Sequence, residues 1–276
     1  MISVIVPAWN HNKVLCDHTL RCIDSIACSN KYYPVELVLV DNGSAGFERK
    51  RVTDWLNVNQ DKFTSLKYLR LNNNLGFIKA INLGIDCCEG EHICFQNNDT
   101  IVSQKTYLNM VRSQKETQAW AVGPMALIPT LPGENPMRKS WQAIDRVRKL
   151  WNTGVASIPP FVHGKTNLDT FNEILSKSNV RGMYPHMIAF FCTVFPKSTI
   201  DRIGYLDEIY GCGLADDDDY CRRIIMMGGR IFFDPKVAII HNHRSSFKIR
   251  AKELGINYHK ESAVNLAIYK QRWRNM

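Results

Sequence analysis

Carboxylates, amides and one imidazole follow the short apolar runs of this 276-residue chain. The polar residues directly after three of these runs are Asn10, Asp41, Asn97, Asn98 and Asp99, and His241 follows the last run. Side-chain oxygens of this kind bind divalent cations and accept hydrogen bonds from a nucleobase or a sugar. An imidazole beside them would shift the preference from magnesium toward manganese.

Four adjacent carboxylates, Asp216 to Asp219, are the second group with chemical potential. In the first turn of a helix each would gain about 0.3–1 kcal/mol from the helix dipole. Asp218 and Asp219 could also pair with the arginines four residues further on. These structural roles account for one or two of the four, and mutual repulsion should raise the pKa of at least one. A carboxylate with a raised pKa suits a general base, which contributes ~10²–10⁴ in rate.

The first half of the chain has the alternation of strands and helices that would position these residues. Predicted strands cover 3–6, 35–40, 68–71 and 92–96, and predicted helices cover 14–27, 52–63 and 77–87. This alternation indicates βαβ units in a mostly parallel sheet with helices on its faces. Ligands bind such sheets beyond the carboxyl ends of the strands, where the polar residues above lie.

The second half begins with an irregular region. Seven of the eleven prolines fall in 124–186, which predicts a loop-rich layer over the sheet. Order returns with a predicted strand at 190–195, a helix from 197, a helix that ends at 227, and strands at 231–233 and 237–240. We expect a single domain made of a half at 1–123, a half at 124–250 and a basic helical tail at 251–276.

Composition excludes several classes. No G-x-G-x-x-G follows the first strand, and no G-x-x-x-x-G-K-[ST] loop occurs, which argues against a dehydrogenase or a P-loop enzyme. The longest apolar run, 187–195, is too short to span a bilayer. The N-terminal residues lack the features of a secretory signal. Nine cysteines without zinc-site spacing suggest reduced core thiols, so we expect a cytoplasmic protein.

The net charge of +9 is concentrated in two segments, because 244–276 carries +6 and 138–149 carries +4. Such local charge predicts an anionic partner, although two solvated surface helices would have the same composition. Residues 263–273 combine basic and apolar side chains. They could lie on the inner face of an anionic membrane or dock on the domain as a helix.

Taken in order, the motifs of the chain resemble those of the family-2 glycosyltransferases of the GT-A fold. The motifs are Pro7-Ala8-Trp9-Asn10, Val40-Asp41-Asn42-Gly43-Ser44, Asn74-Leu75-Gly76-Phe77, Asn97-Asn98-Asp99-Thr100, Leu206-Asp207-Glu208, Asp216 to Asp219 and His241. The closing segment, 269–273, is similar to the tail of rhamnosyltransferase-like members. The resemblance covers the chain except roughly 124–186.

The resemblance implies a nucleoside-diphosphate sugar, UDP- or dTDP-linked, as donor and Mn²⁺ or Mg²⁺ as cofactor. Asp99 and His241 would be the metal ligands. The family usually has two carboxylates after this strand, but Asn97 stands at the first of these positions. A site of one carboxylate and one imidazole would depend on the donor phosphates for further ligands.

The resemblance also assigns roles around the donor and the acceptor. Asp41 would accept hydrogen bonds from the base or ribose, although Asp-Asn-Gly-Ser is also a strong turn sequence. The other residues implied in donor binding are Pro7, Trp9, Asn10, Asn74, Gly76, Asn97 and Asn98. The family's Glu-Asp-x-Asp motif aligns its base with Asp217. Asp216 would then orient the acceptor hydroxyl, and Asp219 would be structural.

Three functions follow from these residues. The first is an inverting, metal-dependent glycosyltransferase that builds a surface glycan, with a lipid-linked acceptor held by the basic segments. The second is a transferase that glycosylates modified bases of nucleic acid, whose acceptor binding would weaken steeply with salt. The third is a catalytically inactive nucleotide-sugar-binding protein, which Asn97 alone favours.

Overall fold

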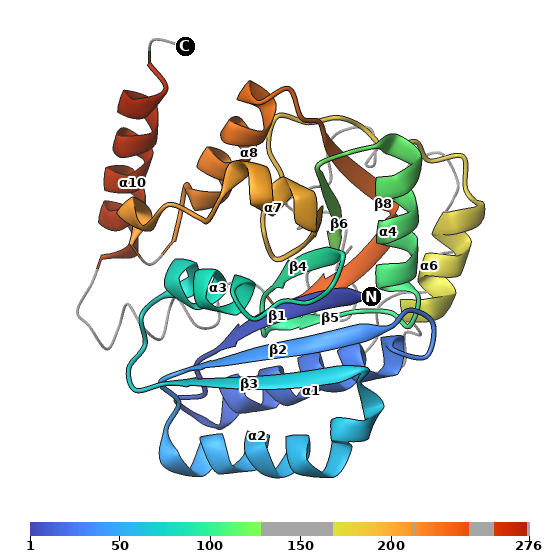
Figure 1. The fold of residues 1–276 in the computed structure, drawn as a ribbon, viewed down its shortest axis with the longest axis vertical. Coiled ribbons are helices and arrows are strands. Elements are labelled where there is room, and N and C mark those ends of the chain that lie inside the picture. Colours follow the sequence, from blue (N-terminus) through green and yellow to red (C-terminus); the bar gives the residue numbers. More distant parts are fainter. Residues whose placement is uncertain (128–167, 212, 243–256, 275–276) are drawn as a thin grey trace, which may run out of the picture.

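The computed structural model describes residues 1–127, 168–211, 213–242 and 257–274. A single eight-stranded sheet with the order β3-β2-β1-β4-β7-β6-β8-β5 runs through the molecule (Figure 1). Its strands are β1 (Ile2–Ala8), β2 (Val35–Asn42), β3 (Ser65–Leu71), β4 (His92–Gln96), β5 (Thr100–Ile101), β6 (Ala121–Leu127), β7 (Cys192–Pro196) and β8 (Ile231–His241).

The sheet is mostly parallel. The pairs β1–β2, β1–β4, β2–β3 and β6–β8 are parallel. β7 is antiparallel to both of its neighbours, β4 and β6, so β6 and β8 run in the same direction as β4. The carboxyl ends of β1, β2, β4 and β8 therefore lie along one edge of the sheet.

Helices cover both faces of the sheet. One core contains side chains of α3 (Phe77–Ile85), α6 (Leu168–Lys177), α7 (Lys197–Ile203) and α8 (Asp216–Met226), and the other contains side chains of α1 (Lys13–Ser29), α2 (Gly46–Asn59) and α4 (Thr106–Thr117). Alternate residues of the fully buried β1 belong to opposite cores, since Ile5 packs in the first core and Val4 and Val6 in the second. The fold is thus the α/β architecture predicted from the sequence, with the period-two alternation that a doubly covered sheet requires.

Several boundaries differ from the predictions. α2 begins at Gly46 rather than at 52, because only Val52 and Leu56 are buried and its first turns carry no apolar pattern. It ends at Asn59 and continues as a 3₁₀ turn, η1 (Gln60–Lys62). β8 is one strand rather than two, because a register shift opposite Pro124 and Met125 accommodates Asp234 and the following proline.

The prediction that 124–186 lacks regular structure is wrong at both ends of that region. β6 continues through Pro124 to Leu127, and α6 occupies Leu168–Lys177. α4 and the start of β6 were also not predicted. Residues 128–167, which include the basic segment 138–149, lie outside the described residues.

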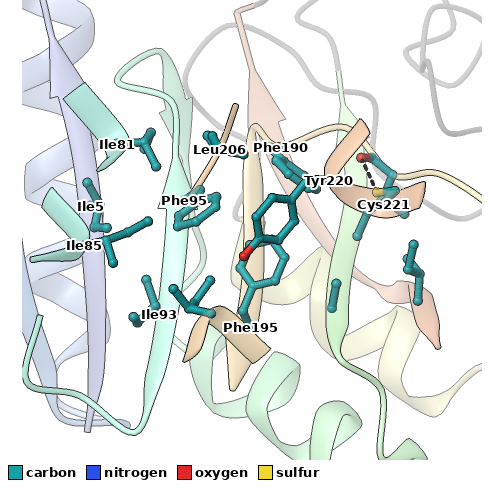
Figure 2. Packing of buried hydrophobic residues seen from close by; sticks show 14 of the residues in the cluster. Ile5, Ile81, Ile85, Ile93, Phe95, Phe190, Phe195, Leu206, Tyr220 and Cys221 are labelled. Atoms are coloured by element: carbon teal, nitrogen blue, oxygen red, sulfur yellow. Dashed lines mark hydrogen bonds between the residues drawn. The ribbon is translucent and has the colours of Figure 1, made fainter. Parts of the chain in front are cut away.

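An aromatic cluster joins α8 to the sheet. Tyr220 of α8 packs against Phe95 of β4, Phe195 of β7 and Phe190, with ring centroids 5.7–6.4 Å apart. Figure 2 shows these rings converging between the strands and the helix. Because aromatic pairs of this geometry bury large apolar areas, the cluster fixes the position of α8 over the sheet.

The tail forms a helix, α10 (Tyr258–Arg272), that docks on the domain beside α8 (Figure 1). Ile268 and Tyr269 pack against the first core. The amide of Asn265 donates to the carbonyls of Tyr210 and Gly213. Of the two alternatives for this segment, docking is therefore the one seen. No helix in the described ranges is long and apolar enough to cross a membrane.

Candidate active site

Asp99 and His241 meet at the carboxyl edge of the sheet. The Nε2 atom of His241 lies 3.3 Å from Oδ1 of Asp99, and both residues are buried. β5 and β8 bring them together, because Thr100 is the register partner of His241. The imidazole of His241 also stacks on Phe191, with centroids 5.0 Å apart. The two residues predicted to bind a metal are thus neighbours with fixed side chains.

Neighbouring side chains favour the ionised form of the Asp99 carboxyl group. Burial alone would raise the pKa of its carboxyl group, but the hydrogen bond to His241 and the nearby charges of His241 and His18 hold the pKa below its usual value. Asn97 lies on the same side, with Nδ2 3.3 Å from Nε2 of His241. The amide therefore occupies the place where a second carboxylate would stand.

One carboxylate and one imidazole fit a divalent cation that takes its remaining ligands from a substrate. The described residues hold no group of three or more His, Cys, Asp or Glu side chains that could bind a metal. Mg²⁺ and Mn²⁺ accept such incomplete protein sites when phosphate oxygens supply the other ligands. The donor set at Asp99 and His241 matches that requirement and does not match a closed structural metal site.

His18 is a site residue that the sequence analysis missed. It lies on α1, and its electrostatic interaction with Asp99 places it at the same edge. Its Nδ1 atom is buried and has no hydrogen-bond partner among the described residues. Because an orphaned buried nitrogen costs free energy, His18 is a candidate for contact with a ligand at this edge. No spacing rule distinguishes a lone histidine in an amphipathic helix, so no pattern in the sequence identified it.

Two of the predicted donor-binding amides form an internal network. Thr19 of α1 donates to Oδ1 of Asn10 at 2.7 Å, and Nδ2 of Asn98 donates to Thr19 at 2.8 Å. The backbone N–H of Asn10 donates to Ser44. The network ties the ends of β1, β2 and β4 to α1. Both amides therefore have protein partners that hold this edge in place.

Asp41 is held by both of its carboxylate oxygens. Oδ1 accepts the backbone N–H of Ser44 at 2.8 Å, which is the turn that the sequence predicted, and Oδ2 accepts the hydroxyl of Tyr68 at 2.6 Å. A guanidinium nitrogen of Arg70 lies 3.6 Å from Oδ2. Burial and the hydrogen bond to Asp41 raise the pKa of Tyr68. β3 thus supplies two partners of Asp41 that the motifs did not identify.

The loop between β3 and α3 is fixed against the end of β2. Oδ1 of Asn74 accepts the N–H of Gly76, and Asn42 both donates to the carbonyl of Gly76 and accepts the N–H of Leu75. Gly76 has a φ of 90°, which a residue with a side chain rarely adopts. The predicted residues Asn74 and Gly76 therefore shape a tight loop at the helix start.

Pro7 and Trp9 lie at the end of β1. Pro7 is buried within the strand, whereas the indole of Trp9 is partly exposed and contacts the ring of His11, with centroids 4.9 Å apart. A partly exposed indole at this edge is available to stack on a planar group. The aromatic residue that the motif predicted near a base is thus accessible, and Pro7 acts as part of the wall.

The four aspartates at the start of α8 have distinct environments. Asp219 is fully buried and accepts from Tyr210, Arg223 and Trp273 at 3.0–3.1 Å. Asp216 is also buried, while Asp217 is partly exposed. The contacts of Asp219 are those of a carboxylate that holds the structure together. Asp216, Asp217 and Asp218 remain the candidates for acid–base chemistry.

Burial raises the pKa of the three remaining carboxyl groups. For Asp216, burial raises the pKa to about 6. For Asp217, burial and the negative charges of Asp216 and Asp218 raise the pKa well above its usual value. Burial raises the pKa of Asp218 as well. Perturbed carboxylates in such a cluster are typical of acid–base groups, because their pKa approaches the working pH.

The segment 188–191 links α8 to the pair of Asp99 and His241. Cys221 of α8 lies 3.7 Å from the carbonyl oxygen of Ile188, a contact drawn in Figure 2, and Phe191 stacks on His241. The N–H of Asn97 also donates to the carbonyl of Phe191. The middle of α8 and the carboxyl edge of the sheet therefore contact opposite ends of one short segment.

Solved structures of known proteins show the class of fold to which this chain belongs. The chain has the fold of the GT-A glycosyltransferases. A structure of GalNAc-T7 with UDP, GalNAc and Mn²⁺ aligns over 87% of this chain and 43% of its own, with a TM-score of 0.61 and 14% identity. The mannosyltransferase of Pyrobaculum calidifontis with GDP-Man and Mn²⁺ aligns over 91% of this chain and 60% of its own, with a TM-score of 0.58 and 18% identity.

The chain belongs to glycosyl transferase family 2, whose model matches residues 3–194. An uncharacterized glycosyltransferase of Haemophilus influenzae is 27% identical over 103 residues, which are 37% of this chain and 38% of that protein. The aligned part of this chain thus covers less than two thirds of the length of each of these three proteins. The family and the fold predicted from the motifs are confirmed.

Proposed function

We propose that the protein is an inverting, metal-dependent glycosyltransferase that moves a sugar from a nucleoside-diphosphate donor to an acceptor hydroxyl. The observation that carries the proposal is the pairing of Asp99 with His241 at the edge where Asp41 and Trp9 also lie. Solved proteins of the same fold were obtained with UDP or GDP-mannose and Mn²⁺, which supports a nucleotide sugar and a divalent cation here.

The donor is placed by residues of the sheet edge. Asp41 faces the base or ribose, and Trp9 offers its exposed face to the base. Asp99 and His241 would hold a divalent cation. The cation would neutralise the negative charge that develops on the leaving diphosphate. In the form that carries a proton on Nδ1, His18 donates a hydrogen bond to a phosphate oxygen. Asp41 would accept the same hydrogen bond from UDP and from dTDP, because uracil and thymine both have an imide N–H.

The transfer itself depends on Asp217. Its ionised carboxylate takes the proton of the acceptor hydroxyl, and the hydroxyl oxygen attacks the anomeric carbon from the side opposite the diphosphate. The bond from the anomeric carbon to the phosphate oxygen breaks, and its electron pair leaves with the nucleoside diphosphate. Configuration at the anomeric carbon inverts. Asp216 orients the hydroxyl, and the raised pKa of Asp217 makes it a stronger base than an ordinary carboxylate.

A lipid-linked glycan is the acceptor that we favour. The exposed side of α10 carries Val264 and Leu266 together with Lys260 and Lys270, a combination suited to an anionic membrane surface. Its other described cations are not all free for nucleic acid, because Arg272 pairs with Asp207 and approaches Asp219. A nucleic-acid acceptor would instead show binding that falls steeply as salt rises.

A thermal-shift series tests the proposal. The melting temperature is measured with UDP, dTDP and GDP, each with and without Mn²⁺, and the nucleotide that stabilises is then supplied as its sugar conjugates. We expect stabilisation that needs nucleotide and cation together, followed by slow release of nucleotide from one sugar conjugate. Stabilisation by nucleotide and cation without turnover of any conjugate would favour the inactive binding protein, and no stabilisation would contradict both.

A further inference from the structure

The loop that leads into α8 has a backbone conformation that its sequence does not favour. Leu214 and Ala215 have φ values of 73° and 75°, and Gly213 before them has a φ of 119°. Only the glycine adopts such values without steric cost. Three successive residues with positive φ therefore come directly before Asp216 and Asp217. A loop of this kind persists only where its surroundings hold it.

α10 supplies contacts on both sides of this loop. Nδ2 of Asn265 lies 2.7 Å from the carbonyl oxygen of Gly213 and 2.8 Å from that of Tyr210. One amide group thus satisfies two backbone acceptors of the loop, and it does so from a helix more than fifty residues further along the chain.

The end of α10 holds the first turn of α8. Nε1 of Trp273 donates to Oδ1 of Asp219 at 3.0 Å, and Arg272 approaches the same oxygen while it pairs with Asp207. Asp219 in turn accepts from Tyr210 and Arg223, so every contact converges on one buried carboxylate two residues after Asp217. The indole of Trp273 and the amide of Asn265 lie two helical turns apart. They contact residues on either side of the strained loop 213–215.

We infer that Asn265 and Trp273 are positioning residues, which hold the strained loop 213–215 and the first turn of α8 so that the carboxylates of Asp216 and Asp217 face the acceptor. The inference rests on the proposed role of Asp217. It differs from a purely stabilising role, because loss of either contact lets the loop relax toward ordinary φ values and displaces the base, while the donor-binding edge of the sheet stays intact.

Kinetics of two variants test the inference. Asn265→Ala removes both loop hydrogen bonds, and Trp273→Phe keeps a ring but loses the hydrogen bond to Asp219. We expect kcat to fall at least tenfold in each, with the KM for the donor and nucleotide binding within twofold of wild type. Ala267→Ser and Gln271→Ala, at exposed positions of the same helix, are the matched controls and should leave kcat unchanged. An unchanged kcat in both test variants, or an equal loss of donor affinity, would overturn the inference.

Hydrogen exchange separates this inference from the proposed function, because it needs no turnover. Amides of 213–219 should exchange faster in Asn265→Ala and Trp273→Phe than in the two controls, while amides of β1 and β4 keep their protection. Equal exchange in all four variants would refute the positioning role even if Asp217 proved to be the base. Faster exchange would sustain that role for the loop even if Asp217→Asn retained turnover, a result that would refute only the proposed base.

Discussion

His241 lies with its Nε2 atom 3.3 Å from Oδ1 of Asp99, so the last strand of the sheet is joined to the turn that follows β4. More than 140 residues separate the two in the sequence, and the short β5–β8 ladder closes that distance. The pair is the structural feature on which the proposed cation site rests. It also explains why a chain with Asn97 in place of a carboxylate retains two candidate ligands.

Replacement of Asp99 by alanine should weaken metal-dependent nucleotide binding. The change removes the carboxylate that we propose as a metal ligand, together with its contact to the imidazole of His241. We expect the affinity for UDP with Mn²⁺ to fall at least tenfold in calorimetry, while binding of UDP without Mn²⁺ changes little. Asp54→Asn, at an exposed position of α2, is the control. Equal affinities for Asp99→Ala and wild type would exclude Asp99 as a ligand.

Replacement of Asp217 by asparagine should abolish transfer without loss of donor binding. The amide retains the shape of the side chain but cannot accept the proton, which should lower kcat by ~10²–10⁴. Initial rates and calorimetry on the same preparation separate the two effects. Asp218→Asn, with the same change one residue further on, should keep kcat within a few-fold. If Asp217→Asn turned over at the wild-type rate, the base would have to be another residue.

The acid limb of the pH profile should depend on the neighbours of Asp217. The base must be ionised, so kcat falls as the pH drops below the pKa of Asp217, which burial and the charges of Asp216 and Asp218 raise. We therefore expect this limb at a higher pH than the one at which an ordinary carboxylate titrates. In Asp218→Asn one negative charge is lost, so the limb should move to lower pH. A limb that does not move, or moves to higher pH, would contradict the electrostatic account.

Asp41→Ala should weaken nucleotide binding more than Tyr68→Phe does. The alanine removes the carboxylate that faces the base and also the turn bond to Ser44, whereas the phenylalanine removes only the hydroxyl that donates to Asp41. Fluorescence of Trp9 at the same edge offers a readout of binding. Similar losses in the two variants would contradict a direct contact between the carboxylate of Asp41 and the nucleotide.

Asp219→Ala should lower the free energy of unfolding by ~3–5 kcal/mol, because it removes one partner of a buried ion pair and leaves Arg223 uncompensated. Urea unfolding followed by circular dichroism measures the change. Asp17→Ala, whose partners are the exposed Lys13 and the partly exposed Arg51, should cost about 1 kcal/mol or less. A loss at Asp219 as small as that at Asp17 would contradict its assignment as a buried structural anchor.

The sequence predicted the first half of the fold because local pattern and tertiary position agree there. β1 and β2 are buried along their whole length, and their β-branched residues fill both cores. The edge strand β3 starts three residues earlier than predicted, since half-exposed Ser65 and Lys67 interrupt the apolar pattern. β6 was missed because Pro124 reads as a break, yet it lies where the ladder with β8 shifts register.

The candidate site was predictable to the extent that its residues follow strands. Asp41 and Asp99 come directly after buried runs, so the parallel topology brings them to one edge. His18 and Tyr68 reach that edge from the interior of a helix and of a strand, where no local signal distinguishes them. The role of Asp219 depends on Trp273, whose docking no pattern within either segment specifies.

An experimental structure with UDP and Mn²⁺ bound would measure the central relationship most directly. The account predicts the cation in contact with Asp99 and His241, the diphosphate beside His18, the base at Asp41, and the carboxylate of Asp217 facing the terminal phosphate across a gap of ~10 Å or less, room for a sugar and an attacking hydroxyl. A nucleotide bound in another cavity, or an Asp217 carboxylate directed away from it, would contradict the account.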